Sequence, residues 1–321
     1  MASIKNKQDG DKMVKMILDC DTGIDDALAI GYAVHSPEIE LLGITVCYGM
    51  APVDYTYRNA KKIVQLLGSD IGVWKGAEKP LVLEKEYNGL IHGMDGLGNT
   101  LGNVQPEDLV DCPSLHAVDY LIEKIYEYKE ELTLVVTGPL TNLALAIKKD
   151  PNIINLVGKV VSMGGALTTP GNVNRYAEAN YAIDPHAANY VYKTNIPITM
   201  VGLDVTRKTL LTTEDVVNWK QKGTELSCFF AEFTQYYLDA YKKIHPYLKG
   251  CALHDPLAIA VGKDPSFVQT IPIHLEVEVE GASAGRTIED LYREESNPLQ
   301  TEVSIKVDAE RFMEDFYKNI V

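Results

Sequence analysis

Four aspartates lie close together near the start of the chain: Asp19, Asp21, Asp25 and Asp26. Like charges at this spacing repel one another unless positive charge lies among them. A hard divalent cation with oxygen ligands would relieve that repulsion. A simpler interpretation is that Asp21 caps a helix while Asp25 and Asp26 favour its N-terminal dipole. On this segment alone both interpretations remain open.

The residues around the aspartates predict how the chain would position them. Met16, Ile17 and Leu18 are apolar and predict a short buried strand, and the apolar residues 27–30 predict the first turns of a helix. Gly23 supplies a turn between the two. In an open α/β sheet such a crossing lies at the carboxyl end of a strand, where ligands bind. We therefore expect the aspartates to lie at a ligand site.

Strands and helices then alternate along the chain, which predicts a parallel sheet with helices outside it. Residues 267–307 alternate like antiparallel or edge strands, and residues 309–320 predict a closing helix. The fold class expected is α/β, an open, mostly parallel, Rossmann-like sheet flanked by helices, with extra C-terminal strands and helices. We expect a disordered N-terminal extension over 1–13 and one domain over 14–321. The other predicted elements are strands at 39–47, 71–74, 132–136, 159–163 and 198–201, and helices at 54–67, 115–128 and 140–148, with further helices opened by Asp184-Pro185 and Asp255-Pro256.

Bulk composition excludes several classes of function. The 321 residues include 30 basic and 45 acidic side chains, a net charge of −15, which argues against nucleic acid and anionic membranes as partners. The five cysteines are scattered without a CxxC pair, so neither a zinc site nor a disulfide framework is expected. No apolar stretch is long enough to span a bilayer. We expect a cytoplasmic protein.

Two further segments have two interpretations each. Residues 75–113 are rich in glycine, as functional lids and disordered loops are, and His92 in this loop is either solvated or faces a ligand. Between residues 229 and 241 an aromatic stripe is either core or a surface for stacking on a base. Tyr237 and Tyr241 in this stripe, which precede His254, are candidates for contacts with a base.

Polar groups recur where strands end or helices begin, and parallel strands would bring these positions to one edge of the sheet. This placement would gather Asp21, Asp25 and Asp26 of the first segment with groups from distant segments. A site of carboxylate and carbonyl oxygens without cysteines or paired histidines suits Ca²⁺ or Mg²⁺ rather than zinc. The distant groups are a carbonyl of the Thr137 turn, Glu178, Asn180 and Asp255.

The sequence resembles the nucleoside hydrolases, in particular the inosine-uridine preferring nucleoside N-ribohydrolases. The resemblance covers most of the chain, and its five motifs occur in the family's order. The first carries the family's DxDxGxDD pattern. The motifs are LDCDTGIDDALAI, VTGPLTNLA, VSMGGA, GNVNRYAEANYAIDPHAA and LHDPLAI.

The resemblance implies roles for individual residues. Asp21 would be the general base that takes a proton from the attacking water, and His254 would protonate the departing base. Ca²⁺ would be held by Asp21, Asp26, Asp255 and the carbonyl oxygen of Thr137, together with the ribose diol and the water. The substrate would contact Asp25, Met163, Asn172, Glu178, Asn180 and His92. The reaction would release ribose and free base from a nucleoside, in a homodimer or homotetramer.

Two positions depart from the family pattern. Met50 follows Gly49 where the family often has asparagine, and Ala179 stands where an aromatic residue is frequent. Both positions would face the nucleoside, so the preference for purine or pyrimidine is left open.

Two other classes of protein share parts of the pattern. A haloacid-dehalogenase-type phosphatase also opens on a strand followed by DxD, but its motif calls for threonine or valine where this chain has Gly23. An inactive nucleoside-binding protein would keep the fold without turnover. The complete set of polar site residues argues against the second class.

Overall fold

The computed structural model describes residues 13–101, 113–291 and 301–320. Residues 1–12, most of the predicted N-terminal extension, lie outside the described residues, as do residues 102–112 of the glycine-rich loop. No helix in the described ranges is long and apolar enough to cross a membrane. The division into an extension and one domain stays a prediction.

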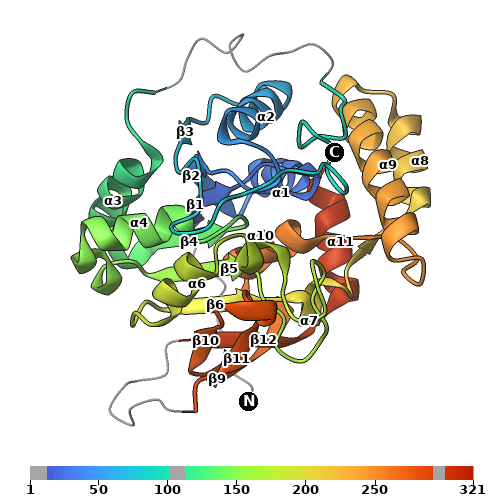
Figure 1. Cartoon of the computed structure of the whole chain (residues 1–321). Coiled ribbons are helices and arrows are strands. Elements are labelled where there is room, and N and C mark those ends of the chain that lie inside the picture. The colour runs from blue at the N-terminus through green and yellow to red at the C-terminus, as the bar shows by residue number, and fades with distance from the viewer. Residues whose placement is uncertain (1–12, 102–112, 292–300, 321) are drawn as a thin grey trace, which may run out of the picture.

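An eight-stranded sheet forms the centre of the molecule, in the order β3-β2-β1-β4-β5-β6-β12-β9 (Figure 1). All neighbours pair in parallel except β12 and β9, which are antiparallel. The predicted open, mostly parallel sheet is therefore confirmed. The strands are β1 (Val14–Cys20), β2 (Ile39–Val46), β3 (Val73–Lys75), β4 (Leu132–Val136), β5 (Lys159–Met163), β6 (Ile198–Val201), β9 (Val268–Ile273) and β12 (Thr301–Val307).

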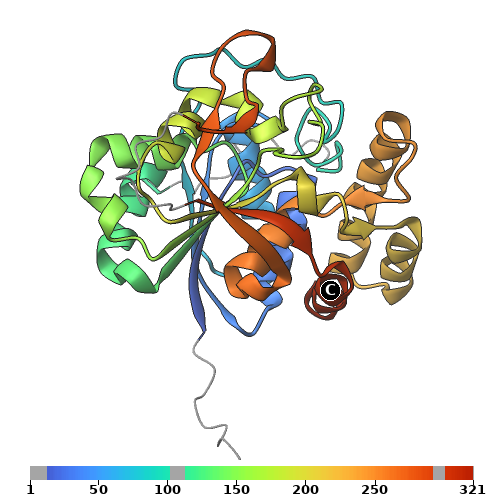
Figure 2. The same cartoon turned by 90° about the horizontal axis from the view of Figure 1, so that it is seen from below.

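Helices cover both faces of the sheet, and each face has its own apolar core. Figure 2 shows α3 and α4 on one side of the strands and α10 and α11 on the other. The first core contains residues of α1, α2, α8, α9, α10 and α11, and the second those of α3, α4 and α6. These helices are α1 (Ile24–His35), α2 (Val53–Leu66), α3 (Ala117–Tyr128), α4 (Thr141–Lys149), α6 (Pro185–Tyr192), α8 (Thr213–Lys222), α9 (Glu225–Ile244), α10 (His254–Lys263) and α11 (Ala309–Asn319).

The C-terminal strands are arranged in a way that local periodicity did not predict. β9 is an antiparallel edge strand as expected, but β12 lies inside the sheet, between β9 and β6, and runs parallel to β6. Two small antiparallel pairs stand apart from the sheet. They are β7 (Leu210–Leu211) with β8 (Cys251–Ala252), and β10 (Leu275–Val277) with β11 (Thr287–Glu289).

Candidate active site

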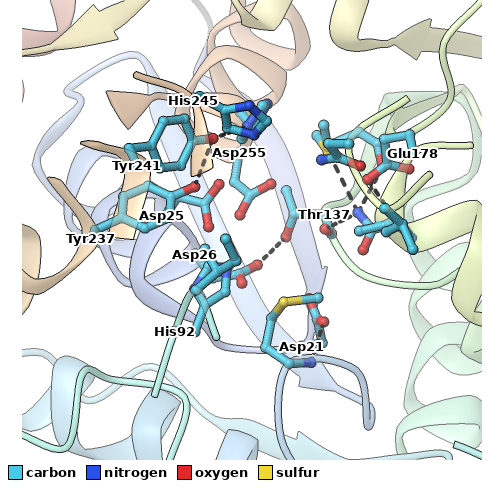
Figure 3. Close-up of a pocket in the computed structure, with 18 residues that line it drawn as sticks. Asp21, Asp25, Asp26, His92, Thr137, Glu178, Tyr237, Tyr241, His245 and Asp255 are labelled. Atoms are coloured by element: carbon cyan, nitrogen blue, oxygen red, sulfur yellow. Dashed lines mark hydrogen bonds between the residues drawn. The ribbon is translucent and has the colours of Figure 1, made fainter. Parts of the chain in front are cut away.

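A cavity of about 120 Å³ lies where β1, β4 and β5 end. Asp21 follows the last residue of β1, Thr137 follows the last residue of β4, and Met163 ends β5. The structure thus brings together segments that are far apart in the sequence (Figure 3). Every site residue predicted from the sequence lines this cavity: Asp21, Asp25, Asp26, His92, Thr137, Met163, Asn172, Glu178, Asn180, Tyr237, Tyr241, His254 and Asp255.

Three buried carboxylates converge in the middle of the cavity. Asp25, Asp26 and Asp255 each offer an oxygen within 4.8 Å of the others. Burial raises the pKa of Asp25 to about 8 and that of Asp26 to about 6, and Asp26 adds a repulsive effect on Asp25. The pKa of Asp255 is also raised, first by burial and then by Asp25 and Asp26. No lysine or arginine is among the described residues that line the cavity.

Asp21 lies beside these carboxylates on the turn after β1, in a tightly enclosed position. Its Oδ2 accepts a hydrogen bond of 2.8 Å from the backbone N–H of Met50. A Cβ atom added to Gly49 would lie 1.9 Å from the same oxygen, so this close approach requires glycine. Burial raises the pKa of Asp21, and the charges of Asp26 and Asp25 raise it further. Gly23, not Asp21, is the N-cap residue of α1.

Thr137 connects the carboxylates to the opposite wall of the cavity. Its hydroxyl donates a 2.7 Å hydrogen bond to Oδ1 of Asp26, and its carbonyl oxygen accepts one of 2.7 Å from Nδ2 of Asn180. The same nitrogen of Asn180 also donates to the carbonyl oxygen of Met163. A carbonyl oxygen has two lone pairs, so Thr137 retains one for a further partner.

Glu178 lies on the wall of the cavity opposite Tyr237 and Tyr241 (Figure 3). Its carboxylate accepts the backbone N–H groups of Asn180 and Gly165 at 2.9 and 3.0 Å, and so caps the short helix α5 (Ala179–Ile183). Burial raises the pKa of Glu178 to about 7. Nearby, Oδ1 of Asn172 is buried without a hydrogen-bond partner. Such an acceptor calls for a donor, which a water molecule or a bound substrate can supply.

At the other end of the cavity, a chain of hydrogen bonds holds His254. Its Nδ1 lies 2.7 Å from the hydroxyl of Thr206, and its Nε2 lies 2.8 Å from the hydroxyl of Tyr241. The Tyr237 hydroxyl in turn donates to that of Tyr241 at 3.4 Å. Burial, with a smaller effect from Arg207, lowers the pKa of His254 to about 3, so the imidazole is neutral in this state.

His92 is buried, and it is held by the first segment of the chain. Its Nδ1 accepts a 2.9 Å hydrogen bond from the backbone N–H of Ile24, and its ring lies 5.2 Å from that of Tyr237. Burial lowers the pKa of His92 to about 3. A neutral imidazole that accepts at Nδ1 carries its proton on Nε2. His92 is therefore buried at the cavity rather than solvated, and its contact with a ligand stays a prediction.

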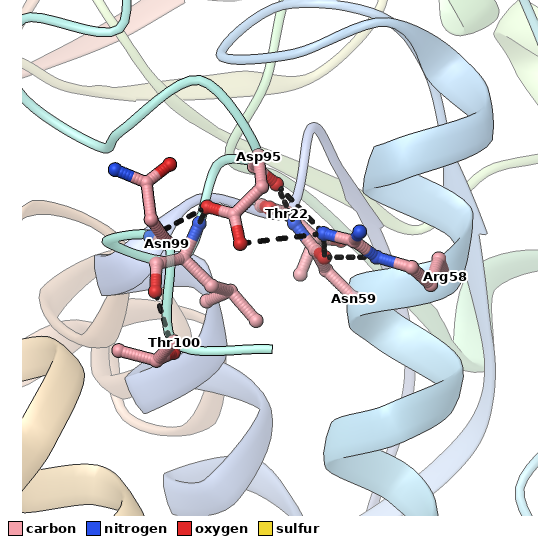
Figure 4. A network of polar contacts seen from close by, with 7 residues as sticks. Thr22, Arg58, Asn59, Asp95, Asn99 and Thr100 are labelled. Atoms are coloured by element: carbon pink, nitrogen blue, oxygen red, sulfur yellow. Dashed lines mark hydrogen bonds and ion pairs between the residues drawn. The ribbon is translucent and has the colours of Figure 1, made fainter. Parts of the chain in front are cut away.

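A polar network fixes the loop that carries His92 (Figure 4). Nδ2 of Asn59 donates to the carbonyl oxygens of Thr22, at 3.1 Å, and Asp95, at 2.8 Å. Arg58 forms an ion pair with Asp95, and the carboxylate of Asp95 accepts the backbone N–H of Leu97. Residues 76–101, the main described part of the glycine-rich loop, contain neither helix nor strand, yet these contacts join them to α2 and to the aspartate turn.

Sequence reasoning missed several contributors to the site. His245 and Val173 also line the cavity, and Thr206 contacts His254 from the short helix α7 (Leu203–Thr206). His245 and Thr206 lie in none of the five motifs, and Val173 lies in the fourth motif without an assigned role, because their contacts arise only when the chain folds. Met50 and Ala179, the two departures from the family pattern, both line the cavity.

Comparisons with known proteins identify the family of the chain. The family model described as "Inosine-uridine preferring nucleoside hydrolase" matches residues 16–314. The chain therefore belongs to the nucleoside hydrolase family, a family of enzymes that act on N-glycosyl bonds.

Individual relatives span nearly the whole chain but differ in the bases that their names state. An inosine-uridine preferring nucleoside hydrolase of Crithidia fasciculata is 36% identical, over 93% of this chain and 94% of that protein. The pyrimidine-specific ribonucleoside hydrolase RihA of Escherichia coli is 35% identical, over 93% and 96%. The solved structure of a purine-preferring ribonucleoside hydrolase from Gardnerella vaginalis has a TM-score of 0.90 and 43% identity, over 95% and 98% of the two chains.

Proposed function

We propose that this protein hydrolyses the N-glycosidic bond of ribonucleosides to release ribose and free base. The observation that carries the proposal is the convergence of the buried carboxylates of Asp21, Asp25, Asp26 and Asp255 on one cavity that a buried histidine and two tyrosines also line. Membership of the nucleoside hydrolase family supports the reaction class and does not favour the phosphatase alternative.

The donor set fits Ca²⁺. Asp25, Asp26 and Asp255 bring three carboxylates within 4.8 Å of one another, their pKa values are raised, and no basic side chain among the described lining residues offsets their charge. Asp21, Asp26, Asp255 and the Thr137 carbonyl oxygen would hold the ion, as all-oxygen ligands do for calcium. When bound, the ion supplies positive charge that makes water more acidic and attracts the ribose hydroxyls.

The chain's own residues then perform the remaining steps. Asp21 removes a proton from the attacking water, and its hydrogen bond from Met50 N–H keeps its carboxylate in place. Asp25, Glu178, Asn180 and Asn172 bind ribose hydroxyls, and Met163 packs under the sugar. Breaking the bond develops positive charge on the ribosyl group, so the anionic oxygens favour the transition state over the neutral substrate.

His254 assists the departure of the base. Its imidazole is neutral in the unliganded site. As negative charge grows on the base, the pKa of His254 rises, so the ring takes up a proton from solvent and donates a proton to the base. Tyr241 holds Nε2, and Tyr237 continues the hydrogen-bonded chain. His92 presents Nε2–H to the base region. Because Met50 and Ala179 line the cavity, base preference is a property to measure.

The decisive experiment is a panel of common purine and pyrimidine nucleosides, assayed for release of reducing sugar with Ca²⁺ and with chelator. We expect release that chelator abolishes and that added Ca²⁺ restores. If no nucleoside releases reducing sugar, the proposed activity is refuted and the alternative of an inactive nucleoside-binding protein remains. Release that is indifferent to chelator would refute the calcium site.

The acid role of His254 has its own test. His254→Ala should slow a natural nucleoside by about a hundredfold or more, because general acids contribute 10²–10⁴-fold. An aryl riboside with an activated leaving group needs no proton and should lose little. Equal losses on both substrates would remove His254 from this role.

Assembly and location are further proposals from the family resemblance. We infer a cytoplasmic homodimer or homotetramer. Light scattering coupled to size exclusion measures the assembly, and a monomeric mass would contradict it.

A further inference from the structure

A second cavity, of about 540 Å³, opens beside the candidate active site. We call it the side cavity. It lies between the loop of residues 83–92, the turn at Gly49, helix α5 and the end of α9. Six residues line both cavities and form the boundary between them: Met50, Ile91, His92, Asn172, Val173 and Ala179.

The shared wall determines which end of a bound nucleoside faces the side cavity. Asp25, Asp26 and Asp255, which are proposed to bind the ion and the ribose diol, are not in its lining, and neither is the proposed acid His254. His92, which is proposed to face the base region, is in the lining, and the 5′ carbon of a ribonucleoside lies on the same face of the ribose ring as the base. Asn172, a proposed ribose contact with a buried, unpartnered Oδ1, is also in the lining. The remaining substituent of the ribose ring is the 5′ carbon.

The chemistry of the lining is largely apolar and partly exposed. Leu90 is 65% exposed, Val173 60% and Ile244 42%, although they come from three separate segments of the chain. Exposed apolar side chains around one hollow mark a binding site for an apolar group. The charged residues in the lining are Lys85, Glu84 and Glu86, one basic and two acidic side chains, a balance that does not favour a phosphate.

Small residues keep the side cavity open toward the site. Ala179 and Ala182 stand on the face of α5 that lines it, and Gly49 lies in the facing turn. A large side chain at Ala179, the position where the family often has an aromatic residue, would occupy the boundary.

We propose that the side cavity binds an apolar substituent on the 5′ carbon, so that 5′-deoxy-5′-alkylthio nucleosides are substrates. The inference rests on the proposed nucleoside hydrolase activity and extends its substrate class. The bond changes are those of the parent reaction: water oxygen bonds to C1′, the C1′–N bond breaks, and the electron pair and a proton leave with the base. The thioether takes no part in them.

The test compares a homologous series on the base that the nucleoside panel shows to be cleaved best. Its members are the 5′-deoxy nucleoside and its 5′-methylthio, 5′-propylthio and 5′-butylthio derivatives. All members lack the 5′ hydroxyl. Any hydrogen bond between that hydroxyl and Asn172 is therefore missing throughout the series and does not affect the comparison. We expect kcat/KM to rise about three- to fourfold for each buried methylene. A flat or falling series overturns the proposal.

A matched pair of variants locates the effect. Leu83 lines the side cavity, and its neighbour Val82 is exposed and does not. Leu83→Asp should abolish the gain along the series and leave the parent nucleoside within about twofold, whereas Val82→Asp should leave both unchanged. Equal effects of the two variants overturn the placement.

Two controls separate this proposal from the function on which it rests. If the parent nucleoside is cleaved but only alkyl groups on the base raise kcat/KM, the side cavity serves the base and the 5′ assignment is wrong. If neither the parent nor any member of the series is cleaved, the proposed function itself fails.

Discussion

The backbone N–H of Ile24 donates a 2.9 Å hydrogen bond to Nδ1 of His92. This contact joins the first residue of α1 to a histidine 68 positions later in an irregular loop. It places the imidazole proton on Nε2 and makes the aspartate turn and the loop one structural unit. Variants on either side of the bond should therefore behave alike.

Gly23→Ala should have the same effect as His92→Ala. A Cβ atom at residue 23 would lie 2.6 Å from Nδ1 of His92 and would displace the ring. We expect each variant to lower kcat/KM by about tenfold to a hundredfold. The double variant should be no slower than either single variant, because they remove the same contact. Losses that multiply would contradict this relationship.

Gly49→Ala should inactivate the enzyme through Asp21. The added methyl group would meet Oδ2 of Asp21 at 1.9 Å and must move the carboxylate. We expect a loss of kcat of about a thousandfold, since misplaced general bases lose most of their effect. Gly68→Ala is the control, because nothing lies within 4 Å of its added Cβ, and its cost should be confined to stability. Full activity of Gly49→Ala would refute the role of this close approach.

The stability of the metal-free protein should fall as pH rises. Burial raises the folded-state pKa of Asp25 to about 8, Asp26 to about 6, and Asp19 and Glu178 to about 7 each. Their unfolded values are near 4, so the folded state binds more protons between these limits. The stabilisation is complete below about pH 4 and is lost as pH rises through about pH 8.

Calorimetry in chelator and in Ca²⁺ checks this window. In chelator we expect Tm to fall by at least about 5 °C from pH 5 to pH 8.5. In Ca²⁺ the fall should be smaller, because the ion binds the ionised carboxylates. Asp255→Asn should abolish the difference between the two conditions. A Tm that rises with pH in chelator would contradict the raised pKa values.

Asn59→Ala should weaken substrate binding, although Asn59 does not line the cavity. The change leaves the carbonyl oxygens of Thr22 and Asp95 without their donor, at a cost of about 1–3 kcal/mol of unfolding free energy. The loop should then open more often, which limited proteolysis detects, and KM should rise more than kcat falls. Asn88→Ala is the matched control, since its side chain accepts a hydrogen bond from the Leu90 N–H in an exposed part of the loop. Equal proteolysis of the two variants would contradict the network's role.

Much of the sheet could be predicted because its strands are local apolar runs. β4, β5 and β6 have the bounds expected from sequence, and the Asp-Pro pairs open α6 and α10. The placement of β12 between β6 and β9 could not be predicted, since strand order depends on contacts between distant segments.

The candidate site could likewise be predicted only in part. Its carboxylates come in motifs, and all the predicted lining residues meet in one cavity. Thr206 and the Asn59 network carry no motif, because they act through hydrogen bonds to residues far away in sequence. Glu178 lines the cavity as predicted and also caps α5, a five-residue helix too short for periodicity to reveal.

The residues that surround the cavity differ in how well they should tolerate substitution. At Gly49 not even a methyl group can be added without meeting Asp21, whereas the neighbouring Met50 and the facing Ala179 and Val173 project side chains toward open space. Combinatorial libraries that aim to change the substrate specificity of the enzyme toward unnatural nucleosides should therefore randomise these three positions and keep Gly49. Gly49 and Met50 are adjacent in the sequence, yet substitutions should abolish activity at Gly49 and be accepted at Met50. Deep mutational scanning would show this difference.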